Sequence, residues 1–205
     1  MLLNGYNLTD SNANIGTFGN GITITAGHQL TVDGTGTNNS QITDFGKAFT
    51  NAGTLNLSNG TVIKNKTGIE NTGTVNLSKV EFNSNTFGID NKVGGIVNLG
   101  EDVTFIGNNM AVQNRGTFNI TDGMTVSNYI DNKDGTINVM KDTTIKHTTY
   151  GSKDVLAVSQ GTVNVADSVL TLEGENTSTD KLDFLVQQKP GATTSTLALT
   201  KGTFD

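Results

Sequence analysis

Asn71-Thr72-Gly73-Thr74-Val75-Asn76-Leu77 is one copy of a motif that recurs along the chain. The shared core of the motif is Gly-Thr-apolar-Asn-apolar, and one copy has isoleucine in place of threonine. Its copies begin at Gly53, Gly73, Gly95, Gly116, Gly135 and Gly161. Successive glycines are separated by 20, 22, 21, 19 and 26 residues. Self-similarity at a nearly constant period of this length is typical of solenoid proteins, in which each repeat forms one coil.

Two further elements recur in each unit. The first is a pair of residues, mostly apolar, that are spaced by two and therefore point to one face of a strand. These pairs are Thr61/Ile63, Val80/Phe82, Val103/Phe105, Met124/Val126, Thr143/Ile145 and Leu170/Leu172. The second is a short segment that ends in asparagine, at residues 48–51, 68–71, 88–91, 111–114 and 129–132. Three short strands in a coil of about 20 residues predict an all-β fold, a right-handed parallel β-helix.

We expect residues 1–205 to form a single β-helix domain. Within it, residues 1–50 form irregular N-terminal coils, residues 51–170 form the regular coils, and residues 171–205 form C-terminal coils with projecting loops. One coil cannot bury its few apolar side chains alone, but stacked coils place them in columns, with Val75 between Leu55 and Val97. Stacking of this kind explains how a chain that is only 34% hydrophobic can be ordered.

The composition excludes several classes of function. The net charge is −6, which disfavours nucleic acid and anionic membrane surfaces as partners, because both require clustered Lys and Arg. The chain contains no cysteine, so disulfides, thiolate nucleophiles and thiolate metal sites are absent. It has no run of 18 apolar residues, so we expect no direct insertion of this segment into a membrane.

The first strand of each coil predicts two columns on the outer surface. If Leu55 and Leu57 face inward, Thr54 and Asn56 face outward. The outward asparagines are Asn56, Asn76, Asn98, Asn119, Asn138 and Asn164. We interpret them as a structural ladder of amides that bond to one another along the rod. The alternative is a flat Thr-x-Asn face that orders water, as ice-binding solenoids do, or that binds sugar hydroxyls.

The asparagines that end the third strand predict a second ladder. They share a face with the apolar residue two positions earlier, and they are Asn51, Asn71, Asn91, Asn114 and Asn132. We expect them to satisfy backbone groups at a corner of the coil. The residues that precede them, Glu70, Asp90, Gln113 and Asp131, are expected to face solvent. A column of divalent cations there is disfavoured, because calcium needs six to eight converging oxygens.

No catalytic constellation is evident, so we predict no catalytic residue, no cofactor and no metal ligand. His28 and His147 are about six coils apart, and the only arginine, Arg115, is expected to stand alone at a turn. The alternative is a glycan-active β-helix enzyme similar to pectate lyases, which would need converging aspartates beside basic residues. The least repetitive surface is the tail, and loops on a rigid scaffold often carry function. A possible binding loop therefore contains Glu173, Glu175, Asn176 and Asp180.

Asn-x-Gly-Thr-apolar-Asn-apolar units lie at 51–57, 71–77 and 114–120, and units with short insertions lie at 91–99 and 132–139. This run resembles the β-helical passenger regions of type V secreted bacterial proteins, which are autotransporter adhesins and filamentous-haemagglutinin-like exoproteins. Phe82-Asn83-Ser84-Asn85 and Phe105-Ile106-Gly107-Asn108 are also similar to the Phe-x-x-Asn motifs of polymorphic membrane proteins.

The resemblance implies a passenger fragment that forms a non-enzymatic rod. Such a rod would lie on the bacterial cell surface, anchored to the outer membrane in the full-length protein, or be secreted. It would bind a protein or glycan receptor on a host cell or another bacterium, or it would associate with itself.

Overall fold

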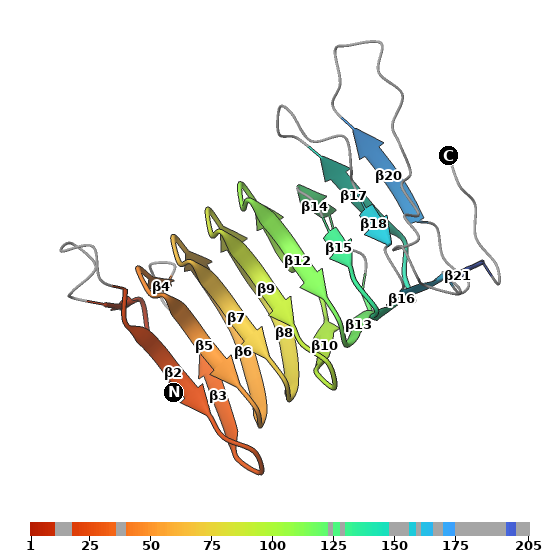
Figure 1. Cartoon of the computed structure of the whole chain (residues 1–205). Coiled ribbons are helices and arrows are strands. Elements are labelled where there is room, and N and C mark those ends of the chain that lie inside the picture. Colours follow the sequence, from red (N-terminus) through yellow and green to blue (C-terminus); the bar gives the residue numbers. More distant parts are fainter. Residues whose placement is uncertain are drawn as a thin grey trace.

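The computed structural model describes residues 1–10, 18–35, 40–122, 125–127, 130–147, 156–158, 161–165, 170–174 and 196–199. Every regular element in these residues is a β-strand, and the strands pair in parallel from one coil to the next. The coils stack from the N-terminal end to the C-terminal end as a solenoid (Figure 1). The predicted all-β parallel β-helix is therefore confirmed.

Each coil contributes to three ladders of strands. The first ladder contains β3 (Gln29–Asp33), β6 (Thr54–Ile63), β8 (Thr74–Asn83), β10 (Ile96–Leu99), β13 (Thr117–Ile120), β16 (Thr136–Val139), β19 (Thr162–Val165) and β21 (Thr196–Leu199). The second contains β1 (Leu8–Thr9), β4 (Gln41–Thr43), the second halves of β6 and β8, β11 (Thr104–Ile106), β14 (Thr125–Ser127), β17 (Thr143–His147) and β20 (Leu170–Gly174). The third contains β2 (Asn20–Ile24), β5 (Lys47–Asn51), β7 (Thr67–Asn71), β9 (Phe87–Asn91), β12 (Met110–Asn114), β15 (Ile130–Asn132) and β18 (Leu156–Val158).

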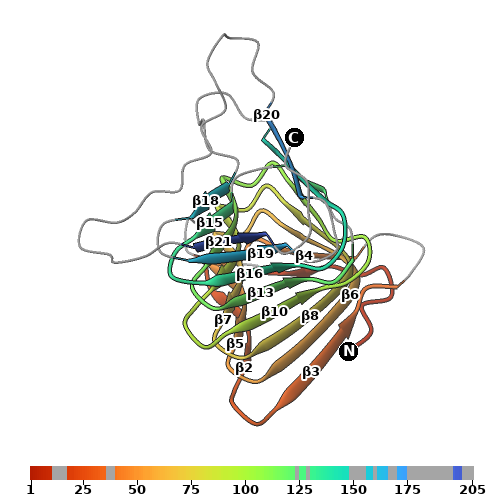
Figure 2. The same cartoon turned by 90° about the vertical axis from the view of Figure 1, so that its right-hand side faces the viewer.

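The first two ladders form one 14-stranded sheet, because β6 and β8 each run through the corner as a single ten-residue strand. The third ladder is a separate seven-stranded sheet. Figure 2, in which the C-terminal end of the rod faces the viewer, shows β2, β5, β7, β15 and β18 along one side and β3, β10, β13, β16 and β19 along the adjacent side. The core lies between these walls.

The core consists of apolar columns that run along the rod. Val75, Val97, Phe118 and Ile137 occupy successive positions of the first ladder, and none is more than 1% exposed. In the second ladder the rings of Phe82 and Phe105 are stacked, with centroids 4.9 Å apart. Each coil buries few side chains, but the columns make the core continuous.

One predicted register is wrong. Thr61 and Ile63 were expected to face inward, but Val62 is the fully buried residue, and it pairs with Ile42 and Phe82. The second half of β6 follows the same spacing as β8, in which the buried phenylalanine lies five residues after Leu77. Ile63 is consequently half-buried and lies opposite Asn83 on the outer side of the sheet.

The corner between the first and second ladders needs a left-handed backbone. Asn59, Lys79 and Asp102 occupy this position in successive coils, with φ of 54°, 55° and 54°. Asparagine and aspartate tolerate this conformation better than most residues, whereas lysine adopts it at a cost in strain. The corner thus aligns three polar side chains along the rod.

Candidate functional site

The outer asparagine column is a continuous chain of side-chain hydrogen bonds. Each amide nitrogen, Nδ2, donates to Oδ1 of the asparagine in the preceding coil. The five donor–acceptor distances, taken from Asn76→Asn56 to Asn164→Asn138, are 2.7, 2.8, 2.8, 2.7 and 2.8 Å. The first member, Asn56, donates to Thr31 Oγ1 at 3.3 Å. The amides in this column are half-buried and point their donors toward the N-terminal end of the rod.

A threonine column runs beside this ladder on the same flat face. Thr74 and Thr117 lie directly before and after Ile96 in the first-ladder register. Ile96 is 39% exposed and interrupts the row of hydroxyl groups. The flat face is therefore a regular amide row beside a broken hydroxyl row.

The inner asparagine column is buried, and its hydrogen bonds run in the opposite direction. Asn71 is typical: its Nδ2 donates to Asn91 Oδ1 at 2.9 Å and to the carbonyl oxygens of Gly73 and Ile96 at 3.0 and 3.1 Å. Its Oδ1 accepts from Asn51 Nδ2 at 2.8 Å and from the Gly73 amide at 3.1 Å. Each asparagine in the column thus ties two coils together and satisfies backbone groups at the corner.

The inner column begins with an unsatisfied atom. Asn51 Oδ1 is buried and has no hydrogen-bond partner in the described residues. Ile24, which is in register with Asn51 in the preceding coil, has an apolar side chain and cannot donate to it. The ladder therefore depends on an asparagine being present at the same position in each successive coil.

A third asparagine ladder was missed by sequence reasoning. Asn65, Asn85 and Asn108 are no more than 3% exposed and line the corner between the second and third ladders. Asn65 Nδ2 donates to Asn85 Oδ1 at 3.1 Å, and Asn85 Nδ2 donates to Asn108 Oδ1 at 2.9 Å. The signal was available, because each of these asparagines follows the buried residue of the second strand by three positions, as in the Phe-x-x-Asn motifs.

The outer face of the third ladder carries ion pairs. Glu70 Oε1 lies 2.7 Å from Lys47 Nζ, and Glu70 Oε2 lies 3.8 Å from Lys92 Nζ. Lys92 also pairs with Asp90. Arg115, which was expected to stand alone, lies 3.4 Å from Asp90 Oδ1. The carboxylates of this column are therefore neutralised by cations of the same face.

Two residues of that column are not exposed as expected. Gln113 is 9% exposed and Asp131 is 4% exposed, so both are buried although they precede the inward asparagines. Lys133 Nζ lies 3.2 Å from Asp131 Oδ2, and a long side chain that pairs with a carboxylate also shields it from solvent.

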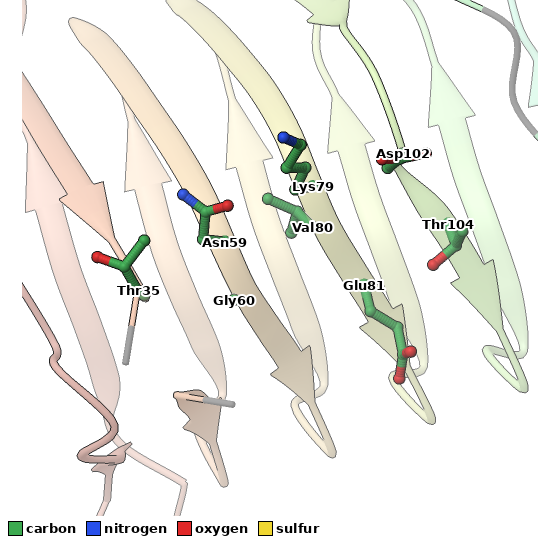
Figure 3. A pocket seen from close by; sticks show the side chains of 9 residues that line it. Thr35, Asn59, Gly60, Lys79, Val80, Glu81, Asp102 and Thr104 are labelled. Carbon is green, nitrogen blue, oxygen red and sulfur yellow. The ribbon is translucent and has the colours of Figure 1, made fainter. Parts of the chain in front are cut away.

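A groove follows the corner between the first and second ladders. Its volume is about 440 Å³, and it extends over four successive coils. Figure 3 shows its polar side chains on successive coils, namely Thr35, Asn59, Lys79, Glu81, Asp102 and Thr104. Gly60 and the buried Val80 also line it, and they lie opposite each other in the ladder.

Hydrogen bonds and ion pairs hold several groups at this groove. Asn59 Nδ2 and the Thr35 amide each donate to Asp33 Oδ1 at 3.0 Å, and these bonds hold the pKa of the Asp33 carboxyl below its usual value. Lys79 Nζ lies 3.0 Å from Glu101 Oε1, which raises the pKa of the lysine. Glu81 Oε1 accepts from Asn83 Nδ2 at 2.8 Å. Both signs of charge are therefore present along one narrow groove.

The predicted tail loop is described only at its start. Glu173 lies in β20, in register with Lys146, so it belongs to a strand rather than to a loop. Glu175, Asn176 and Asp180 lie outside the described residues. His28 is exposed, and its Nδ1 lies 3.1 Å from Thr25 Oγ1. His147 ends β17 in another part of the rod.

In the part of the chain that the structure describes, His, Asp and Glu do not form a group of three or more that could hold a metal ion. The same residues include no helix long and apolar enough to cross a membrane. The chain matches no protein-family model, no curated protein and no solved structure. Its function therefore has to be inferred from its own geometry.

Proposed function

We propose that this chain is a non-enzymatic, adhesin-type rod, a passenger fragment that attaches bacteria to a surface receptor or to each other. The observation that carries the proposal is the repetition of the same outward groups at every coil. The outer ladder from Asn56 to Asn164 presents one amide per coil along the rod. An extended, rigid surface of this kind suits attachment over many weak contacts, which add up to strong binding.

The resemblance to type V passenger regions also supports the proposal. It favours a location on the bacterial cell surface or in the secreted fraction, with an outer-membrane anchor in the full-length protein. The neutralised third face adds support, because the ion pairs of Glu70 and Asp90 keep a long carboxylate column from repelling an approaching cell surface.

The test is to display the chain on bacteria that neither aggregate nor adhere, and to measure settling and binding to cultured host cells. We expect a gain in at least one of the two. Cells that display the Phe118→Ala variant provide the control, because loss of this buried ring should destabilise the coils around β13 and weaken attachment while the surface residues stay the same. A folded rod at the cell surface that changes neither settling nor binding would contradict the proposal.

Two variants distinguish between the two attachment surfaces that the sequence suggests, which are the tail loop and the flat face. Deletion of residues 175–180 removes the predicted loop and leaves β20 intact. Replacement of Asn98 and Asn119 by lysine places charge on the flat face instead. Because the repeated amides of the flat face carry the proposal, we expect the lysine variant to lose attachment and the deletion to keep it. Loss of attachment on deletion alone would instead place binding in the predicted loop.

A further inference from the structure

The groove between the first and second ladders has the properties of a binding site for an extended ligand. It is bounded by fixed backbone, because Asn59 and Lys79 lie within the ten-residue strands β6 and β8. Its volume of about 440 Å³ falls in the range of ordinary ligand sites. Its four coils, at about 4.8 Å per rung, give it a length of about 14 Å.

The groove presents groups that recognise hydroxyls. Amide, carboxylate, ammonium and hydroxyl side chains alternate along it, and Glu81 and Thr104 lie directly opposite each other in the ladder. A sugar hydroxyl both donates and accepts, so it can bridge a carboxylate and an amide or hydroxyl. The rung spacing is also close to the length of one pyranose unit, so each step from one coil to the next spans about one sugar.

Other ligand classes fit less well. An extended peptide repeats its side chains every two residues, about 6.6 Å, which does not match the rungs. It also cannot add to the sheet here, because β6 and β8 already pair with neighbouring strands on both sides. A metal ion is disfavoured within the described residues, because the carboxylates of the groove do not converge. The groove is therefore better suited to a glycan.

The charge of the groove restricts which glycan. Glu81 and Asp102 line it, and Asp33 is hydrogen-bonded to its wall. Among the described residues that line it, the only lysine is Lys79, and it is paired with Glu101. The local charge is therefore negative, and an acidic polymer such as polygalacturonate would be repelled.

We propose that this groove binds a segment of about three sugars of an uncharged, linear polysaccharide, with the chain axis along the rod. Glu81 and Asp102 accept hydrogen bonds from sugar hydroxyls, while Asn59 and Lys79 donate. This proposal rests on the proposed attachment function, because it names the chemistry of the receptor that the rod would bind.

The test is an NMR titration of the purified, isotope-labelled chain with three trisaccharides. Cellotriose and triacetylchitotriose are the uncharged probes, and trigalacturonate is the acidic one. We expect saturable amide shifts confined to the groove with at least one uncharged probe and none with trigalacturonate. Saturation by trigalacturonate, shifts that map elsewhere, or no shifts with either uncharged probe would overturn the proposal.

Matched variants tie the binding to the groove. Glu81→Gln and Asp102→Asn keep the shape of each side chain and remove its charge, and each should weaken binding about fivefold to tenfold, because a charge-assisted hydrogen bond becomes a neutral one. Thr117→Ala, on the flat face outside the groove, should leave affinity unchanged. Equal affinity of all three variants would overturn the proposal. Attachment of displaying cells is scored separately, so groove binding without attachment would contradict the function and not the groove.

Discussion

The inner and outer asparagine columns use the same residue type for different purposes. Asn71 ends β7 and faces inward, whereas Asn76 lies in β8 of the same motif copy and faces outward. Asn71 is 0% exposed and bonds to two other asparagines and to backbone groups of two coils. Asn76 is half-buried and bonds to the asparagines above and below it.

Burial, rather than residue type or hydrogen-bond geometry, decides how much each amide contributes to stability. The distances within the two ladders are nearly equal, at 2.7–2.9 Å. When an outer amide is removed, its partners can bond to water. When an inner amide is removed, buried donors and acceptors stay without a partner, which costs about 1–3 kcal/mol for each group.

The largest loss of stability is expected from the removal of a buried aromatic ring. Phe118→Ala should lower the free energy of unfolding by about 3–5 kcal/mol, because it opens a cavity in the first-ladder column. Chemical denaturation monitored by circular dichroism measures the loss.

The same variant tests how far damage spreads. Each coil contacts only its neighbours, so hydrogen exchange should accelerate near β10, β13 and β16 and remain slow near β5 and β7. Uniform acceleration along the rod would show that the coils unfold as one cooperative unit instead.

The comparison itself is tested by one alanine substitution in each column of the same coil. Asn91→Ala should cost about 2 kcal/mol, because it removes three hydrogen bonds of the buried column, those with Asn71 Nδ2, Asn114 Oδ1 and the carbonyl of Thr117. Asn98→Ala, its matched control, should cost less than about 1 kcal/mol. Equal losses in thermal or chemical unfolding would remove the distinction between the columns.

The fold could be predicted from the sequence because a repeat of nearly constant period indicates which residues, far apart in the chain, stack on one another. The Gly-Thr-apolar-Asn-apolar units fix which residues stack, and the structure has Val75 between Leu55 and Val97 as expected. The register of Val62 was not predictable from the glycine spacing, because Thr61, Val62 and Ile63 are all β-branched and suit either face. Two spacings distinguish them: the distance from the preceding buried leucine and the distance of three residues to Asn65.

The site was less predictable, because it depends on contacts between coils. The pairing of Arg115 with Asp90 joins residues 25 positions apart, and nothing local to Arg115 signals it. The groove arises only when the corner residues Asn59, Lys79 and Asp102 align along the rod, which requires knowledge of every coil's length.

A smaller loss of stability is expected from the removal of a cation on the outer face of the third ladder. Lys92 contacts both Glu70 and Asp90, and its removal leaves two carboxylates in adjacent coils without this cation. Lys92→Ala should destabilise by about 1 kcal/mol or less, because the side chains are partly exposed. The loss should shrink in high salt, which screens the remaining repulsion. A salt-independent loss would indicate that the lysine stem contributes packing instead.

The smallest loss of stability is expected at the corner between the first and second ladders, and it depends on pH. Asn59 donates to Asp33, and this bond lowers the pKa of the aspartate from its ordinary value of 3.8. A carboxyl whose pKa is lower in the folded state than in the unfolded state stabilises the fold at pH values above its ordinary pKa. This stabilisation disappears as the pH falls through the lowered pKa.

Asn59→Gly removes the amide, and glycine accepts the positive φ of this position. The stability difference between the two proteins should therefore be largest near neutral pH and shrink below about pH 4, while NMR titration should show the pKa of Asp33 rising in the variant. Asn56→Ala, which touches Thr31 rather than a carboxylate, should give a difference that does not change with pH. A stability difference that does not change with pH in either variant would show that the bond from Asn59 to Asp33 does not form in solution.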